Sequence, residues 1–157
     1  MNSVINSVLL IDDDEPTNFI NTLLMEETGY VGNISIAENG LKALGYLKQA
    51  LAHEGEASGF FVPQLIFLDV NMPRMNGWEF LAEYKNIKSS LLEDTIIIIM
   101  LTTSFNPEDK IRAGNIAEVA AIENKPLTSE MIERVISTHF PRRSGSNEEK
   151  SQRELAV

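Results

Sequence analysis

The segment "LIFLDVNMPRMNGWEF", residues 65–80, contains one complete unit of the predicted fold. Four apolar residues in a row, 65–68, predict a strand that is covered on both faces, and Asp69 ends it. The loop "VNMPRMNG" follows at 70–77. The next apolar side chains have helical spacing, and they are Trp78, Phe80, Leu81 and Tyr84. A strand, a loop and a helix therefore follow one another, with a carboxylate at the end of the strand.

The same succession of a strand and a helix recurs along the rest of the chain. The other predicted strands are residues 8–11, 34–40 with a closing turn, 95–101 and 119–122. Each precedes a segment with apolar residues at helical spacing, and these segments begin near Pro16, Leu41, Pro107 and Leu127. The helix after Pro107 is predicted to be short, because Gly114 and Asn115 follow soon. This alternation predicts an α/β fold, with a five-stranded parallel sheet between five helices.

The first of these helices is signalled by a regular apolar pattern. Pro16 suits the first helical turn, and Gly29 ends the pattern. Between them, apolar residues recur at helical spacing at Phe19, Ile20, Leu23 and Leu24. Their spacing predicts a helix over this segment.

Length and charge limit the classes of function. The 157 residues, of which 43% are hydrophobic, suit one domain. Thirteen Lys and Arg against 23 Asp and Glu give a formal charge of −10, which disfavours nucleic acids and anionic membranes as ligands. A protein partner with a basic patch is compatible with this charge. The chain has no cysteine, which excludes disulfides and thiolate chemistry.

No segment predicts export or a membrane span. The N-terminus lacks a basic start, and the longest apolar run, 96–101, is far shorter than the roughly 20 residues that a membrane helix needs. A cytoplasmic protein is therefore predicted. One ordered domain is expected over residues 1–141. Residues 142–157 mix charged and small polar residues without periodicity, which predicts a disordered tail.

Five polar side chains stand where the predicted strands end. They are Asp12 and Asp13 after the first strand, Asp69 after the third, Thr102 after the fourth and Lys125 after the fifth. In an open parallel sheet these strand ends line one crevice, where ligands bind. The acidic run 12–14 alone would also fit a solvated loop that caps a helix, and Asp14 is expected to face outward. Three carboxylates in one crevice repel one another, however, and a divalent cation would turn this repulsion into coordination.

Four segments of the chain occur in the order typical of one family. They are "LLIDDDEPTN" (9–18), the segment 65–80, "IIMLTTS" (98–104) and "NKPLT" (124–128). Together they resemble the receiver domain of two-component response regulators, over about residues 8–140. The resemblance implies a flavodoxin-like (βα)5 fold with strand order 2-1-3-4-5.

The resemblance also implies a role for three of the polar residues. Asp69 would be the phosphoacceptor, whose carboxylate takes a phosphoryl group from the phosphohistidine of a sensor histidine kinase or a phosphotransfer protein. Thr102 would hydrogen-bond the phosphoryl group, and Lys125 would pair with it. A cis peptide bond between Lys125 and Pro126 is expected, as in the family.

The same resemblance implies a bound metal ion. Mg²⁺, with Mn²⁺ as a second possibility, would be held by Asp13, Asp69 and the backbone carbonyl of Asn71. Asp12 would act mainly through water and through placement of the metal.

The implied protein is a single-domain response regulator that switches its contacts with an unknown downstream protein. It would not be an enzyme, although it would take up phosphoryl groups with the help of Mg²⁺ and lose them slowly. One departure from the family is Ile122, which stands where a Tyr or Phe is usual, so a large aromatic movement is not expected. The connection before the third strand, 53–63, is also longer than usual.

Three alternatives follow from the same residues. A receiver fold used only as a docking scaffold predicts the loss of a site residue, and none is lost. A phosphohydrolase with an aspartate nucleophile usually has a second aspartate two residues later, where this chain has Asn71. A flavodoxin-like cofactor binder needs a loop that cradles phosphate after the first strand, and "DDDEPTN" places three negative charges there.

Overall fold

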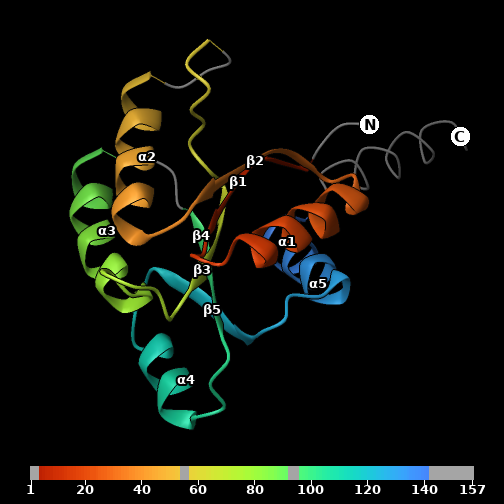
Figure 1. Ribbon diagram of the computed structural model, residues 1–157, viewed down its shortest axis with the longest axis vertical. Coiled ribbons are helices and arrows are strands. Elements are labelled where there is room, and N and C mark those ends of the chain that lie inside the picture. The colour runs from red at the N-terminus through yellow and green to blue at the C-terminus, as the bar shows by residue number, and fades with distance from the viewer. Residues whose placement is uncertain (1–3, 54–56, 92–95, 142–157) are drawn as a thin grey trace, which may run out of the picture.

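Five strands and five helices alternate along the chain (Figure 1). The computed structural model describes residues 4–53, 57–91 and 96–141. The elements are β1 (Ile5–Ile11), α1 (Glu15–Thr28), β2 (Val31–Ala37), α2 (Gly40–His53), β3 (Leu65–Asp69), α3 (Gly77–Leu91), β4 (Ile97–Thr102), α4 (Pro107–Gly114), β5 (Val119–Asn124) and α5 (Ser129–His139). The predicted tail, 142–157, and the predicted first residue of the fourth strand, Thr95, lie outside the described residues.

All five strands are parallel and form one sheet in the order β2-β1-β3-β4-β5. This confirms the predicted α/β class, the flavodoxin-like topology and the strand order. The predicted strand ends differ by a few residues, since β1 already begins at Ile5 and β5 continues to Asn124. Within the described ranges, no helix is both long and apolar enough to cross a membrane.

Helices cover both faces of the sheet, with α1 and α5 on one face and α2 and α3 on the other (Figure 1). Successive residues of β1 contribute to opposite faces. Leu9 belongs to the core cluster that contains Phe80 of α3, and Leu10 belongs to the cluster that contains Met25 of α1 and Ile132 of α5. Burial of both faces explains why the strand is apolar at consecutive positions rather than at alternate ones.

Helix α1 is capped at both ends by the residues that its sequence suggests. Asp14 is exposed, as predicted, and its carboxylate accepts a hydrogen bond from the Thr17 amide (3.1 Å). Gly29 closes the helix with a φ of 70°, in the left-handed region that favours glycine.

Of the four apolar residues that predict α1, only Leu24 packs against the core, and it is half-buried. Phe19, Ile20 and Leu23 are 64%, 56% and 43% exposed. The side that faces the protein consists of Asn18, Asn21 and Met25. Asn18 donates a hydrogen bond from Nδ2 to the backbone carbonyl of Asp12 (2.9 Å), which fixes the rotation of the helix about its axis. Most of the apolar pattern of α1 therefore lies on the molecular surface.

Helix α4 is short, as predicted, and it is held by few contacts. Its N-cap is Asn106, and Ala113 is its one buried residue. The Arg112 guanidinium lies 4.4 Å from the centroid of the Trp78 ring, a cation–π contact that joins α4 to the start of α3. Ile111 is 65% exposed.

Candidate functional site

Three carboxylates from the ends of β1 and β3 form one cluster. One oxygen of each of Asp12, Asp13 and Asp69 lies within 4.8 Å of the others. Asp12 and Asp69 are buried, while Asp13 is exposed. The strands β1 and β3 are parallel neighbours, with Ile11 beside Leu68, so the residues that follow these positions are held side by side. The structure thus brings together the three aspartates that the sequence places at strand ends.

Lys125 places a positive charge inside this acidic cluster. Its Nζ lies 2.7 Å from Oδ2 of Asp12 and 3.2 Å from Oδ1 of Asp69. The Lys125 side chain is only 17% exposed, so these ion pairs are largely shielded from solvent. Burial alone would lower the pKa of Lys125, but its hydrogen bond to Asp12 and the charges of Asp69 and Asp12 outweigh burial and raise this pKa.

The carboxyl group of Asp69 lies in an environment that disfavours its ionised form. The pKa of Asp69 is raised from 3.8 to about 6, mainly by burial and next by the negative charge of Asp12, while Lys125 opposes this rise. The cluster therefore has more negative charge than Lys125 can balance. A hard dication takes oxygen ligands of this kind, so the donor set fits a metal such as Mg²⁺.

This raised pKa predicts how stability depends on pH. Because the pKa of Asp69 is higher in the folded state than in the unfolded state, its favourable contribution is complete below pH 3.8 and is lost as the pH rises through about 6. In EDTA, we expect the free energy of unfolding of wild type to fall by roughly 2 kcal/mol relative to that of Asp69→Asn as the pH rises from about 4 to 7. This figure allows for screening by solvent at the site. Urea unfolding of both proteins across this range measures the difference. Parallel curves would contradict this prediction.

Two further predicted site residues flank the cluster. Thr102 is buried at the end of β4, and its Oγ1 accepts a hydrogen bond from the Ser104 amide (3.0 Å). A hydroxyl that accepts one hydrogen bond can still donate its own hydrogen. The Lys125 amide donates to the Thr102 carbonyl (2.8 Å), which holds these two residues together. The Asn71 amide donates to Oδ1 of Asp69 (3.3 Å), and metal binding by the Asn71 carbonyl stays a prediction.

Two neighbours of the site were not identified from the sequence. Asn124 donates from Nδ2 to the Ser104 carbonyl (2.7 Å) and so ties the end of β5 to the loop after β4. Gly77 packs directly on the end of β3, because a Cβ at this position would lie 2.7 Å from the Asp69 carbonyl oxygen and 3.0 Å from the Val70 Cα. The pattern of a glycine at the first turn of a helix is too common to reveal this contact.

The close approach at Gly77 predicts a large difference between two glycine substitutions. Gly77→Ala must displace backbone next to Asp69, so we expect a loss of about 1–3 kcal/mol of stability. At Gly45, inside α2, an added Cβ would have no atom within 4 Å, so Gly45→Ala should gain roughly 0.5–1 kcal/mol through helix propensity. Urea unfolding measures both changes. Equal effects of the two substitutions would show that the contact at Gly77 is not restrictive.

These features define a class of protein: a parallel α/β domain with an acidic crevice that contains a lysine and a buried aspartate. The family model for the response regulator receiver domain matches residues 8–137. The chain therefore belongs to the family of response regulator receiver domains.

Individual relatives agree with this family. The chain is 31% identical over 129 residues to "Probable methanogenesis regulatory protein FilR2" of Methanothrix harundinacea, covering 82% of this chain and 77% of the relative. A crystal structure of a two-component response regulator from Cytophaga hutchinsonii has a TM-score of 0.71 at 30% identity, covering 85% of this chain and 96% of that one. The Mn²⁺-bound form of response regulator Rcp1, a protein known from Synechocystis, has a TM-score of 0.67 at 26% identity, covering 87% of this chain and 95% of that one.

Proposed function

We propose that this receiver domain is a phosphoacceptor in a two-component phosphorelay and that Asp69 carries the phosphoryl group. The observation that carries this proposal is the position of Asp69, which is buried at the end of β3 among Asp12, Asp13 and Lys125. Three carboxylates within 4.8 Å of one another, with Lys125 paired to two of them, are costly to hold together unless a cation balances their charge. The donor would be the phosphohistidine of a sensor histidine kinase or of a phosphotransfer protein.

The transfer is a single displacement at phosphorus. A carboxylate oxygen of Asp69 forms a bond to phosphorus while the bond from phosphorus to the donor's ring nitrogen breaks, and that nitrogen keeps the electron pair. Lys125, whose Nζ lies 3.2 Å from Oδ1 of Asp69, would pair with the phosphoryl oxygens. The Thr102 hydroxyl would donate its hydrogen to one of them. Positioning and charge thus provide most of the rate enhancement.

The metal ligands follow from the same cluster. Asp13, Asp69 and the Asn71 carbonyl would hold Mg²⁺, or Mn²⁺, with Asp12 acting through water. When bound, the metal would neutralise charge on the phosphoryl oxygens. The close grouping of the three carboxylates, within 4.8 Å of one another, supports this assignment, because a positive ion between them would relieve their mutual repulsion.

The proposed role is that of a switch rather than of a turnover enzyme, because Asp69 is itself consumed until its phosphoryl group is hydrolysed. The added charge would act through Thr102 and Lys125, which are joined by a backbone hydrogen bond. Ile122 of β5 packs against the core cluster on the α2 and α3 side, and a branched aliphatic side chain there can make only a small rotamer change, so the change at the surface would be modest. A downstream protein would read the altered surface.

Incubation with acetyl phosphate tests this function without knowledge of the donor. In Mg²⁺ we expect the intact mass to increase by one phosphoryl group, and in EDTA we expect no increase. Hydroxylamine should remove the adduct, as it does with acyl phosphates. An unchanged mass at saturating acetyl phosphate and Mg²⁺ would count against the proposed function.

A further inference from the structure

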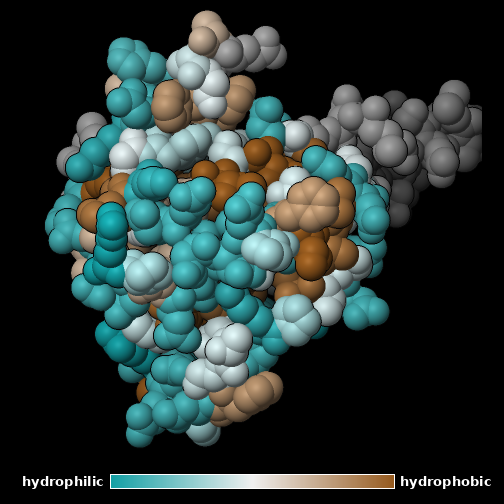
Figure 2. All heavy atoms as spheres, in the orientation of Figure 1, coloured by the Kyte–Doolittle hydropathy of each residue, from teal (hydrophilic) through white to brown (hydrophobic). Residues whose placement is uncertain are grey.

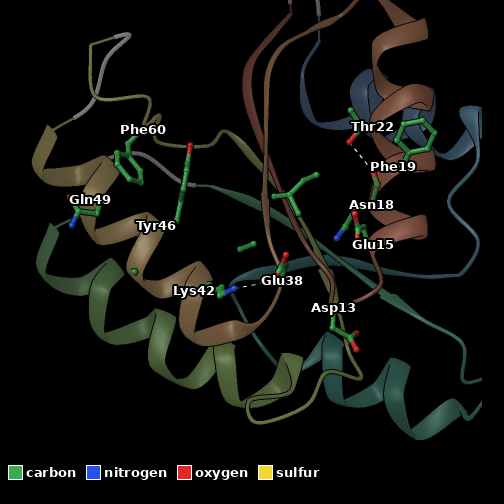
Figure 3. Close-up of a pocket in the computed structure, with 13 residues that line it drawn as sticks. Asp13, Glu15, Asn18, Phe19, Thr22, Glu38, Lys42, Tyr46, Gln49 and Phe60 are labelled. Carbon is green, nitrogen blue, oxygen red and sulfur yellow. Dashed lines mark hydrogen bonds and ion pairs between the residues drawn. The ribbon is translucent and has the colours of Figure 1, made fainter.

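A groove crosses the edge of the sheet between α1 and α2, next to the acidic cluster. Its volume is about 990 Å³, and we call it the α1–α2 groove. Figure 3 shows its walls: Phe19 and Thr22 on α1, and Tyr46 and Gln49 on α2. The floor is the end of β2, which is an edge strand. Edge strands that are left uncovered favour association with other chains.

Apolar side chains line one end of this groove. Phe19 is 64% exposed and Ile36 of β2 is 47% exposed, and both line it. The rings of Tyr46 and Phe60 pack against each other with centroids 5.3 Å apart (Figure 3). Brown hydrophobic side chains gather on the surface in the region of α1 in Figure 2. Ile20 and Leu23 of this helix are also exposed, although neither lines the groove. An exposed apolar area of this kind marks an interaction surface.

The other end of the groove is acidic. Asp13, Glu15 and Glu38 line it, and Lys42 forms an ion pair with Glu38 (2.9 Å). Three negative charges against one positive charge leave a net negative rim. Asp13 belongs to both the groove and the carboxylate cluster, so an occupant of this end lies beside the candidate acceptor.

Gly45 keeps the α2 wall of the groove open. It lies inside a helix, where glycine is unfavourable by roughly 0.5–1 kcal/mol relative to alanine, but no atom lies within 4 Å of the position that a Cβ would take there. Packing within the chain therefore does not require a glycine at this position. Any side chain there would project into the groove and reduce its volume.

We propose that the α1–α2 groove binds a helix of a partner protein, apolar along one face and carrying Lys or Arg at the end that lies over Asp13, Glu15 and Glu38. Apolar groups from both walls suit an amphipathic helix laid between α1 and α2. β2 and the residue after it line the groove only at 36–38, so an occupant of the groove meets the side chains of α1 and α2 rather than the length of the β2 edge. A second copy of this chain is disfavoured by its formal charge of −10. The inference goes beyond phosphoryl transfer and does not depend on it.

A synthetic helical peptide tests this proposal with the full-length chain. The probe has about 15 residues, leucines at helical spacing and lysines at one end, and a second peptide has glutamates in place of the lysines. We expect the lysine peptide to shift the amide resonances of the groove, at Thr22, Gly45 and Phe60, and the glutamate peptide to bind at least about tenfold more weakly. Shifts confined to α4 and β5, or equal binding of both peptides, would overturn the proposal.

Three substitutions separate binding in the groove from nonspecific binding elsewhere on the surface. Gly45→Phe fills the groove and should weaken binding of the lysine peptide by about tenfold or more. Gly114→Phe, at an equally open position in α4, should change the affinity for this peptide by less than about twofold. Glu15→Lys should weaken binding of the lysine peptide and strengthen binding of the glutamate peptide. Equal effects of Gly45→Phe and Gly114→Phe on peptide affinity would overturn the proposal. It would also be overturned if wild type sediments as a dimer and Gly45→Phe as a monomer, because the occupant of the groove would then be a second copy of this chain. Phosphoryl uptake from acetyl phosphate should be unchanged in Gly45→Phe. The proposed peptide binding in the groove and the proposed phosphoacceptor function can therefore be tested separately.

Discussion

Asp69→Asn is expected to abolish phosphoryl uptake from acetyl phosphate, while wild type reaches a stable level of modification. Asparagine has nearly the same shape as aspartate but lacks the nucleophilic carboxylate. The fold should survive, because the substitution removes a buried charge that Asp12 repels. Intact mass spectrometry measures uptake, and circular dichroism confirms that the variant is folded.

Asp14→Asn is the matched control for this experiment. Asp14 is also an aspartate beside the cluster, but it is exposed and serves as the N-cap of α1, a role that asparagine performs equally well. We expect uptake at the wild-type level in this variant. Uptake that persists in Asp69→Asn and disappears in Asp14→Asn would move the acceptor to the loop after β1.

Mg²⁺ is expected to raise the melting temperature of wild type, and Asp13→Ala is expected to lose this response. A ligand that binds only the folded state stabilises it by about 2.7 kcal/mol at a concentration of 100 times its Kd. For a chain of this size, that corresponds to an increase of roughly 5–10 °C. The carboxylates of Asp12, Asp13 and Asp69, within 4.8 Å of one another, are the reason to expect preferential binding. Differential scanning calorimetry in EDTA and in Mg²⁺ measures the shift.

The control for the metal experiment is Glu15→Ala, which removes an exposed carboxylate close to the cluster in the sequence. Its melting temperature should respond to Mg²⁺ as wild type does, at constant ionic strength. If Asp13→Ala retains the full response, the metal is not held by Asp13. If Glu15→Ala also loses the response, the effect is general screening of negative charge rather than coordination.

The fold could be predicted from the sequence because the three central strands, β1, β3 and β4, are buried on both faces. Leu9 and Leu10 face opposite core clusters, so both must be apolar, and a run such as 65–68 is typical of a strand inside a parallel sheet. The candidate site could be predicted for a related reason. Parallel strands bring their carboxyl ends to one edge, so Asp12 and Asp69 are neighbours in space although far apart in the chain.

Other features depend on three-dimensional contacts that periodicity does not encode. The spacing of Phe19, Ile20 and Leu23 identifies a helix but does not show which side of the helix faces the sheet. The hydrogen bond from Asn18 to the Asp12 carbonyl holds the polar side of α1 toward the sheet. The ion pair between Lys125 and Asp12 joins residues 113 positions apart in the chain. The tight packing of Gly77 against the Asp69 carbonyl likewise appears only once α3 is placed on β3.

The weak attachment of α4 has a consequence for how quickly its surface can change during evolution. With Ala113 as its only buried residue, the other positions of α4 can be substituted with little effect on the stability of the domain. Its sequence can therefore drift and acquire new recognition properties while the crevice around Asp69 stays intact. The sheet preserves the chemistry, and α4 is a region where paralogous copies of such a gene can diverge in what they recognise.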